Sequence, residues 1–196
     1  TVQYDLSDVD LDVCSLAVAY DYGSGWRYGH IKSASTGTAG TGYVKSISTD
    51  VTDATFVWDT KSAANEDGAF TGEDSEVYVK ITPFDPGQSG DAQTSDAFFV
   101  DNQAPTGVAC SSPPDGDSPG GPDVMLSAAT ASDLNKISYY LQLDANSSFD
   151  NGTGELQESG YQTSSNWTAT SLTTSQTYYW HVRAKDTLGN VSSYAA

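Results

Sequence analysis

The sequence predicts an all-β protein made of two tandem antiparallel β-sandwich domains. Helix signals are nearly absent, and apolar residues instead alternate with polar residues in short runs. Residues that favour turns, mainly Gly, Ser, Thr, Asn and Asp, separate these runs, as in sheets with short connections. A chain of 196 residues has room for two domains of ordinary size.

The first domain is expected over residues 1–101. Apolar residues alternate in three runs and stand together in two more: Val2, Tyr4 and Leu6; Leu16, Val18 and Tyr20; Phe56-Val57-Trp58; Val77, Val79 and Ile81; Ala97 to Val100. A passage rich in Gly, Ser and Thr, residues 23–42, lies between them. The domain opens on what resembles the second strand of a sandwich. We therefore expect its first strand to be missing, either cut off or supplied by a neighbouring chain.

The second domain is expected over residues 102–196. Its strand-like runs follow the same scheme: Val124 and Leu126; Ile137, Tyr139, Leu141 and Leu143; Trp167 to Leu172; Tyr178, Trp180, Val182 and Ala184. The last run is the clearest alternation of the chain and predicts a strand with one face in the core.

The two halves share an internal repeat. The residues Val77-x-Val79-x-Ile81-x-Pro83-x-Asp85 match Tyr178-x-Trp180-x-Val182-x-Ala184-x-Asp186 without a gap. Earlier in each half, Leu6-Ser7-Asp8 matches Ala131-Ser132-Asp133. Two matches in the same order indicate a duplicated module.

These runs carry a resemblance to known families. Residues 178–186, followed by Gly189-Asn190, resemble the sixth strand and following loop of fibronectin type III-like modules. Residues 56–59, 77–85 and 99–106 resemble immunoglobulin-like repeats of large bacterial surface proteins. The resemblance implies tandem sandwiches in an extracellular or cell-surface protein. In the second strand, Leu126 stands where the family usually has a tryptophan.

A short linker separates the two modules. Residues 98–100 close one apolar run, and Asp101, Asn102 and Pro105 precede the next run. Pro105 biases Ala104 toward an extended conformation and removes a backbone donor, so neither helix nor sheet is expected to continue here.

The net charge of −18 limits the expected partners. Such a field repels phosphate backbones and anionic lipids, so we expect neither nucleic-acid binding nor membrane insertion. The acids comprise 21 Asp and 5 Glu. Aspartate ligates hard cations from loops, and it also caps turns or keeps a surface soluble. Composition alone leaves these roles open.

The linker and two loops predict a Ca²⁺ site. In this topology, the loops that carry Asp133 and Asn135, and Asp186, lie at the end where the chain enters the second module. The linker supplies Asp101 and Asn102. This arrangement resembles cadherins, whose Asp/Asn-rich linker meets acidic loops of the following domain. The alternative is that these residues cap turns through backbone amides.

A second acidic group is expected in the first module. One loop carries three aspartates, and a second loop carries one: Asp8, Asp10, Asp12 and Asp85. Close carboxylates repel one another, so the loops should bind a cation, here Ca²⁺, or stay open and solvated.

Enzymatic activity is not expected. His30 lies in a Gly-rich passage, and His181 falls on the outward face of its strand. The sequence contains no G-x-S-x-G motif to expose a nucleophilic serine.

The sequence therefore predicts a non-enzymatic structural or adhesive module, a stiff acidic spacer or fibre segment. Its partners would be neighbouring repeats or subunits of the same assembly. The alternative is an accessory carbohydrate-binding or spacer module of a secreted polysaccharide-active enzyme. In that case Trp26, Tyr28 and Tyr43 of the Gly-rich passage would stack on glycans, unless they pack on their own module.

Overall fold

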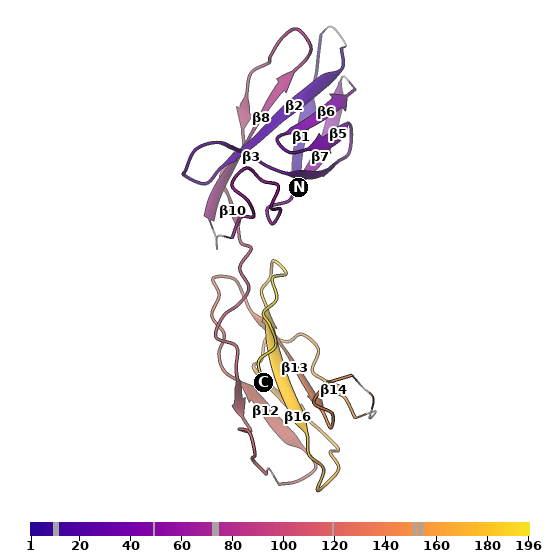
Figure 1. Cartoon of the computed structure of the whole chain (residues 1–196), viewed down its shortest axis with the longest axis vertical. Helices are drawn as coiled ribbons and strands as arrows, with labels where there is room; N and C mark the ends of the chain where they lie inside the picture. Colours follow the sequence, from indigo (N-terminus) through magenta and orange to yellow (C-terminus); the bar gives the residue numbers. More distant parts are fainter. Residues whose placement is uncertain (10–11, 49, 72–74, 119, 151, 153–154) are drawn as a thin grey trace. The chain divides into compact units, whose positions relative to one another are not determined.

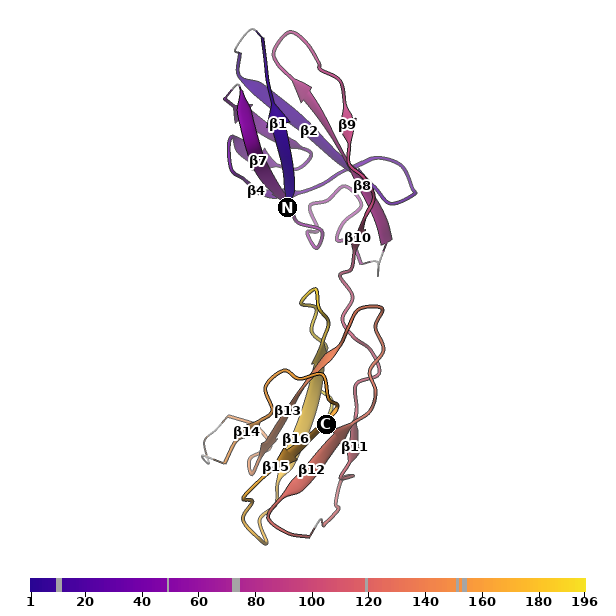
Figure 2. The same cartoon turned by 180° about the vertical axis from the view of Figure 1, so that it is seen from behind.

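The computed structural model describes residues 1–9, 12–48, 50–71, 75–118, 120–150, 152 and 155–196. Its regular elements are β-strands in antiparallel sheets (Figures 1 and 2), which confirms the predicted fold class. The chain divides into two compact units, Thr1–Asn102 and Gln103–Ala196. Among the residues described, no helix has the length and apolar character needed to span a bilayer.

The first unit contains two sheets. The smaller has the order β1-β7-β4, formed by Val2–Leu6, Val51–Trp58 and Ile31–Ala34. The larger has the order β10-β8-β2-β6-β5, formed by Phe98–Val100, Ser75–Phe84, Cys14–Asp21, Tyr43–Ile47 and Thr38–Gly40. Two short strands extend it: β3 (Arg27–Tyr28) pairs with β2, and β9 (Gln93–Thr94) pairs with β8.

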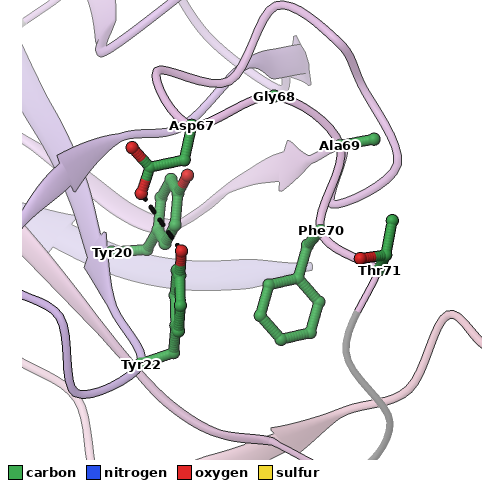
Figure 3. Close-up of a pocket in the computed structure, with 7 residues that line it drawn as sticks. All are labelled: Tyr20, Tyr22, Asp67, Gly68, Ala69, Phe70 and Thr71. Carbon is green, nitrogen blue, oxygen red and sulfur yellow. Dashed lines mark hydrogen bonds between the residues drawn. The ribbon is translucent and has the colours of Figure 1, made fainter.

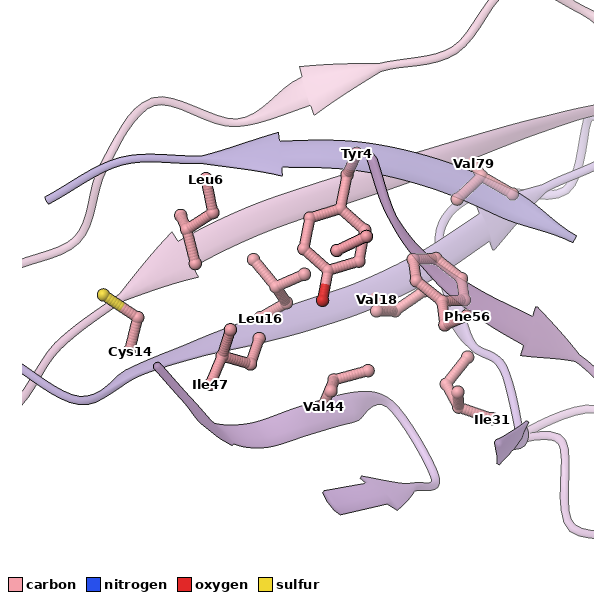
Figure 4. Close-up of a cluster of buried hydrophobic side chains, with 11 residues drawn as sticks. Tyr4, Leu6, Cys14, Leu16, Val18, Ile31, Val44, Ile47, Phe56 and Val79 are labelled. Carbon is pink, nitrogen blue, oxygen red and sulfur yellow. The ribbon is translucent and has the colours of Figure 1, made fainter. Parts of the chain in front are cut away.

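The core of the first unit follows the predicted alternation. Leu16 and Val18 of β2 are buried and pack with Tyr4 of β1 and Phe56 of β7, as Figure 4 shows. Burial of each such side chain contributes about 1.5–3 kcal/mol, because its apolar surface leaves water. The alternating pattern therefore determines which face of each strand builds the core.

A second aromatic cluster lies at the β10 end of the first unit. Tyr20, Phe70 and Val100 are buried in it together with Val77. The ring of Tyr20 stacks on Trp58, with centroids 4.6 Å apart. The strand that leads into the linker is therefore held by apolar contacts up to Val100.

The second unit also contains two sheets. The orders are β11-β12-β15, formed by Cys110–Ser112, Val124–Ala128 and Asn166–Ala169, and β14-β13-β16, formed by Gln157–Glu158, Ser138–Asp144 and Tyr179–Lys185. Leu126, Leu141 and Val182 are completely buried in the core. Leu126 thus fills, as a core residue, the position where the resemblance leads one to expect tryptophan.

The internal repeat has a counterpart in strand pairing. In the first unit Val18 pairs with Ile81, and in the second Leu141 pairs with Val182. The sequence match placed Ile81 and Val182 at the same position of the repeat. In both units the matched residue of the repeat therefore pairs with an apolar residue of the neighbouring central strand.

The units differ at one sheet edge. In the second unit β12 lies between β11 and β15. In the first unit β1 pairs with β7, and none of the described strands pairs with the other edge of β1. The sequence predicts that a first strand is missing at this edge, either cut off or supplied by a neighbouring chain. Both alternatives stay predictions.

Candidate metal centre

The linker places Asp101 directly after β10. Val100 is buried, and the carboxylate-bearing Asp101 that follows it is only 5% exposed. Farther along, Thr106 and Ser132 exchange two backbone hydrogen bonds, with N···O distances of 2.9 and 2.8 Å. This bridge joins the beginning of the second unit to the residue that precedes Asp133.

Asp186 belongs to the loop after β16 and is 2% exposed. The backbone N–H of Asn190 donates to its Oδ1 at 2.9 Å, and the Asn190 side-chain amide donates to its Oδ2 at 2.7 Å. The Asp186 N–H in turn donates to the Asn190 carbonyl at 3.1 Å. These bonds close the loop and fix the orientation of the carboxylate.

Asp133 belongs to the loop before β13 and is half-buried. Its Oδ1 accepts a hydrogen bond from the Asn135 N–H at 2.7 Å, which makes an Asx turn. The predicted turn-capping role therefore applies to Asp133.

The structure brings together three of the predicted metal ligands. One carboxylate oxygen from each of Asp101, Asp133 and Asp186 lies within 4.8 Å of the other two. Anionic groups this close repel one another when ionised, and a bound cation offsets that repulsion. Calcium takes six to eight oxygens at about 2.3–2.6 Å, so backbone carbonyls and water would complete its shell.

The two predicted amide ligands have different surroundings. The side-chain amide of Asn102 donates to the Phe70 carbonyl at 2.7 Å and lies 3.1 Å from Thr60 Oγ1. Asn102 therefore supports a loop of the first unit. Asn135 contributes its backbone N–H to the Asp133 turn, and a ligand role of its side chain stays a prediction.

Two of the acids predicted to form a site in the first unit, Asp8 and Asp85, accept hydrogen bonds from backbone N–H groups of their own loops. The Asp12 N–H donates to Asp8 Oδ2 at 3.0 Å. Asp85 Oδ1 accepts from the N–H groups of Gly87 and Gln88, both at 2.6 Å. Asp10 lies outside the described residues. The one metal-binding group found among the residues described is the other cluster, so a site here stays a prediction.

The aromatic residues proposed to stack on glycans have contacts within their own unit. Lys80 Nζ lies 4.2 Å from the ring centroid of Trp26, and Lys45 Nζ lies 4.3 Å from that of Tyr43. Tyr28 is 53% exposed. Trp26 is itself 36% exposed, so stacking on glycans and packing on the same module both stay predictions.

His181 has the surroundings of a structural residue. Its ring is stacked between Phe149 and Tyr194, with centroid distances of 3.6 and 3.8 Å. Its Nε2 lies 2.6 Å from Gln142 Oε1. Burial, and secondarily the charge of Arg183, lower the pKa of His181 to about 4. The ring is therefore neutral near pH 7.

Comparison with known proteins identifies solved structures of similar fold. No protein-family model matches the chain, and no curated protein sequence matches it. The crystal structure of chicken CNTN1 FN1–FN3 domains aligns with a TM-score of 0.44 and 13% identity, over 94% of this chain and 54% of that one. Domains A168–A170 of titin align with a TM-score of 0.41 and 14% identity, over 100% and 65% of the two chains. This chain thus spans less than two thirds of either one.

Proposed function

We propose that the chain is a non-enzymatic structural module, an acidic spacer or fibre segment of an extracellular or cell-surface assembly, whose linker is stiffened by Ca²⁺. The observation that carries the proposal is the convergence of the carboxylates of Asp101, Asp133 and Asp186 within 4.8 Å. Two of the three are buried, and burial raises the free-energy cost of keeping a carboxylate charged.

The donor set favours a hard cation. All three groups are carboxylates, whereas zinc and copper sites generally draw on His or Cys. Ca²⁺ accepts irregular shells that mix carboxylates, carbonyls and water, while Mg²⁺ requires near-octahedral geometry. The net charge of −18 raises the local concentration of any cation.

The positions of the ligands along the chain suggest the effect of binding. Asp101 belongs to the linker, Asp133 to the loop before β13, and Asp186 to the loop after β16. A cation shared by these residues would tie the linker to both loops and restrict its backbone. Partners of the module would be neighbouring repeats or subunits of the same assembly.

Calorimetry and melting in Ca²⁺ test the proposal. We expect Ca²⁺ to bind and to raise the melting temperature. At a free Ca²⁺ concentration of a hundred times Kd, the free energy of unfolding should increase by about 2.7 kcal/mol. Asp133→Asn keeps the turn acceptor and removes one charge, so it should weaken binding at least about tenfold. The matched control is Asp115→Asn, an exposed acid of the same unit outside the cluster, which should bind as the parent does.

The stiffening is a separate measurement. ¹⁵N relaxation of residues 101–104 should show reduced fast motion in Ca²⁺ and recover with chelator. A melting temperature that chelator does not change, together with no heat of binding, would overturn the calcium proposal. Binding without a change in relaxation would overturn only the stiffening role.

A further inference from the structure

The first unit contains a pocket that shares no residue with the acidic cluster. Its volume is about 330 Å³, and Figure 3 shows the residues that line it: Tyr20, Tyr22, Asp67, Gly68, Ala69, Phe70 and Thr71. Small-molecule sites generally fall between about 300 and 1,000 Å³. This pocket therefore has room for one small ligand, such as a single sugar ring.

The wall of the pocket is a loop organised by Asn65, which is 4% exposed. Its side-chain amide donates to the carbonyls of Ser62 and Asp59 at 2.8 and 3.0 Å. Its Oδ1 accepts from the His30 N–H at 2.7 Å and from Trp58 Nε1 at 2.9 Å. Because these bonds hold the loop before any ligand arrives, little ordering cost is left to binding.

The far end of the same loop is fixed as well. The Phe70 N–H donates to the Thr60 carbonyl at 2.8 Å, and the Phe70 carbonyl accepts from the Asn102 amide at 2.7 Å. Gly68 has φ of +80°, a conformation that side-chain-bearing residues rarely adopt. The turn at Gly68 thus presents Asp67 and Phe70 on the same side of the loop, toward the aromatic rings (Figure 3).

Asp67 supplies the polar group of the pocket. Its Oδ1 accepts from Arg27 Nε at 3.0 Å, and its Oδ2 accepts from the Tyr22 hydroxyl at 3.2 Å. A carboxylate has about four acceptor sites, so these two bonds leave further capacity for hydroxyl donors. The side chain is 32% exposed, which leaves it accessible to a ligand.

Three aromatic rings supply the apolar surface. Tyr20 and Phe70 are buried, whereas Tyr22 is half-buried and retains contact with solvent. The rings of Tyr22 and Phe70 are 5.3 Å apart at an interplanar angle of 73°. A half-exposed tyrosine offers an apolar ring face beside its polar hydroxyl.

The charge of the pocket selects the class of ligand. Glu66 and Asp67 disfavour an anion, and the ion pair between Arg27 and Asp67 offsets the charge that would attract a cation. A neutral carbohydrate matches both surfaces, since it has hydroxyl groups around its edge and C–H groups on its ring face. We propose that this pocket binds one residue of a neutral carbohydrate, with hydroxyls on Asp67 and the ring face on Tyr22.

Saturation-transfer NMR on the whole chain tests the proposal. The probes are the methyl glycosides of glucose, galactose and mannose and the disaccharides cellobiose and maltose, each up to tens of millimolar. We expect millimolar affinity for at least one of them, because a ligand with few atoms gains little binding energy. Amide shifts should change at residues 67–71.

Two variants locate the site. Asp67→Asn removes an ionised acceptor and Tyr22→Leu removes the ring face, so each should weaken binding, Asp67→Asn by about tenfold or more. Glu66→Gln is the matched control for the first, because Glu66 is the adjacent acid and does not line the pocket. Tyr78→Leu is the matched control for the second, since the Tyr78 hydroxyl also donates to a carboxylate, Glu76, at 3.2 Å, and Tyr78 does not line the pocket. Both controls should bind as the parent does.

Three results would overturn the proposal. One is the lack of saturation transfer to every neutral sugar while the amide spectrum shows a folded protein. Another is binding that both variants leave unchanged. The last is a preference for tetramethylammonium, which would assign the pocket to cations instead. The calcium proposal is unaffected by any of these results, because Asp67→Asn should leave Ca²⁺ affinity unchanged.

Discussion

The two units place their aromatic residues differently on a shared frame of strands. In the first unit Tyr4, Tyr20 and Phe56 are buried in the interior. In the second unit the ring of Tyr139 is buried beside the completely buried Leu126 and Leu141, whereas several other large rings lie outside the sheets or at the margin of the core. In both units the central strands nevertheless form an antiparallel pair with apolar residues opposite each other, Val18 with Ile81 and Leu141 with Val182.

The outer face of the β14-β13-β16 sheet gathers the rings of the second unit. His181 is stacked between Phe149 and Tyr194. Arg183 lies over the rings of Tyr194 and Tyr140, with distances of 4.7 and 4.9 Å to their centroids. The alternation of a strand therefore determines two faces, while the choice of face for the aromatic residues is free to differ between repeats.

The largest expected effect is a loss of stability confined to the core of the first unit. Phe56→Ala removes a completely buried ring from the first unit and should lower its free energy of unfolding by about 3–5 kcal/mol. The second unit should keep its stability, because Phe56 belongs to the cluster of the first unit alone. Hydrogen exchange followed by mass spectrometry reports the two units separately.

The control is Phe99→Ala, since Phe99 is 68% exposed and its loss should change stability by less than about 0.5 kcal/mol. Equal loss of protection in both units of Phe56→Ala would show that they unfold together. The two cores would then share one free energy of unfolding, and the effect of Phe56→Ala could not be assigned to the first unit alone.

The next effect concerns a buried amide. Asn65→Ala removes the donor to the carbonyls of Asp59 and Ser62 and the acceptor for His30 and Trp58. Buried polar groups left unpaired cost about 1–3 kcal/mol each, and water reaches some of them, so we expect about 2–4 kcal/mol in total. Denaturant unfolding followed by tryptophan fluorescence measures it.

Asn190→Ala is the matched change in the second unit, because Asn190 is 5% exposed and its side chain donates to the carboxylate of Asp186. It should cost about 1–2 kcal/mol. A larger loss from Asn190→Ala than from Asn65→Ala would contradict the assignment of Asn65 as the organiser of its loop.

Alternation made the strands and the core predictable from sequence. Leu16, Val18 and Tyr20 stand two residues apart, so the burial of all three follows from the geometry of a strand. The resemblance indicated which loops lie at one end of a module, and the metal site at Asp101, Asp133 and Asp186, which follows from it, stays a prediction.

The loop of the pocket was not predictable in this way. Residues 59–71 have no apolar period, and Asn65 stands next to other polar residues while its partner His30 lies far away in the sequence. The role of the Asn102 side chain was not predictable either. The sequence places Asn102 in the linker, and only the folded structure shows that its amide donates a hydrogen bond to the Phe70 carbonyl. Irregular loops depend on such long-range hydrogen bonds, which leave no periodic signal.

A pH effect distinguishes the second unit. The pKa of His181 is lowered by burial to about 4, below its usual value near 6.5 in an unfolded chain. The stabilisation is complete above pH 6.5 and is lost as pH falls toward 4, because the unfolded chain takes up the proton first. Because the ring is only half-buried, solvent screening reduces the effect, and we expect a loss of about 1–2 kcal/mol over this range, measured by urea unfolding at successive pH values.

His181→Phe provides the control, since phenylalanine can keep the stack with Phe149 and Tyr194 but does not titrate. The variant should lack the part of the pH dependence between 6.5 and 4 that belongs to the histidine. Carboxylates contribute equally to both proteins, so only the difference between the two curves is interpreted. Identical curves would contradict the depressed pKa.

The smallest effect compares cation–ring contacts in the two units. Arg183→Met keeps an apolar stem and removes a guanidinium that lies over the rings of Tyr140, Tyr161 and Tyr194. Each contact contributes about 0.5–1 kcal/mol at an exposed site. Among the described residues, Arg183 Nε is buried without a hydrogen-bond partner, and this cost offsets part of the gain. We expect a net loss of about 1 kcal/mol.

Lys80→Met is the counterpart in the first unit, where a single ring, that of Trp26, lies under the ammonium group at 4.2 Å. Its loss should be about 0.5 kcal/mol. If Lys80→Met costs as much as Arg183→Met, the number of rings does not determine the contribution. The rings on the outer face of β16 would then stabilise the second unit mainly through apolar packing. The two units would differ only in where their aromatic rings pack.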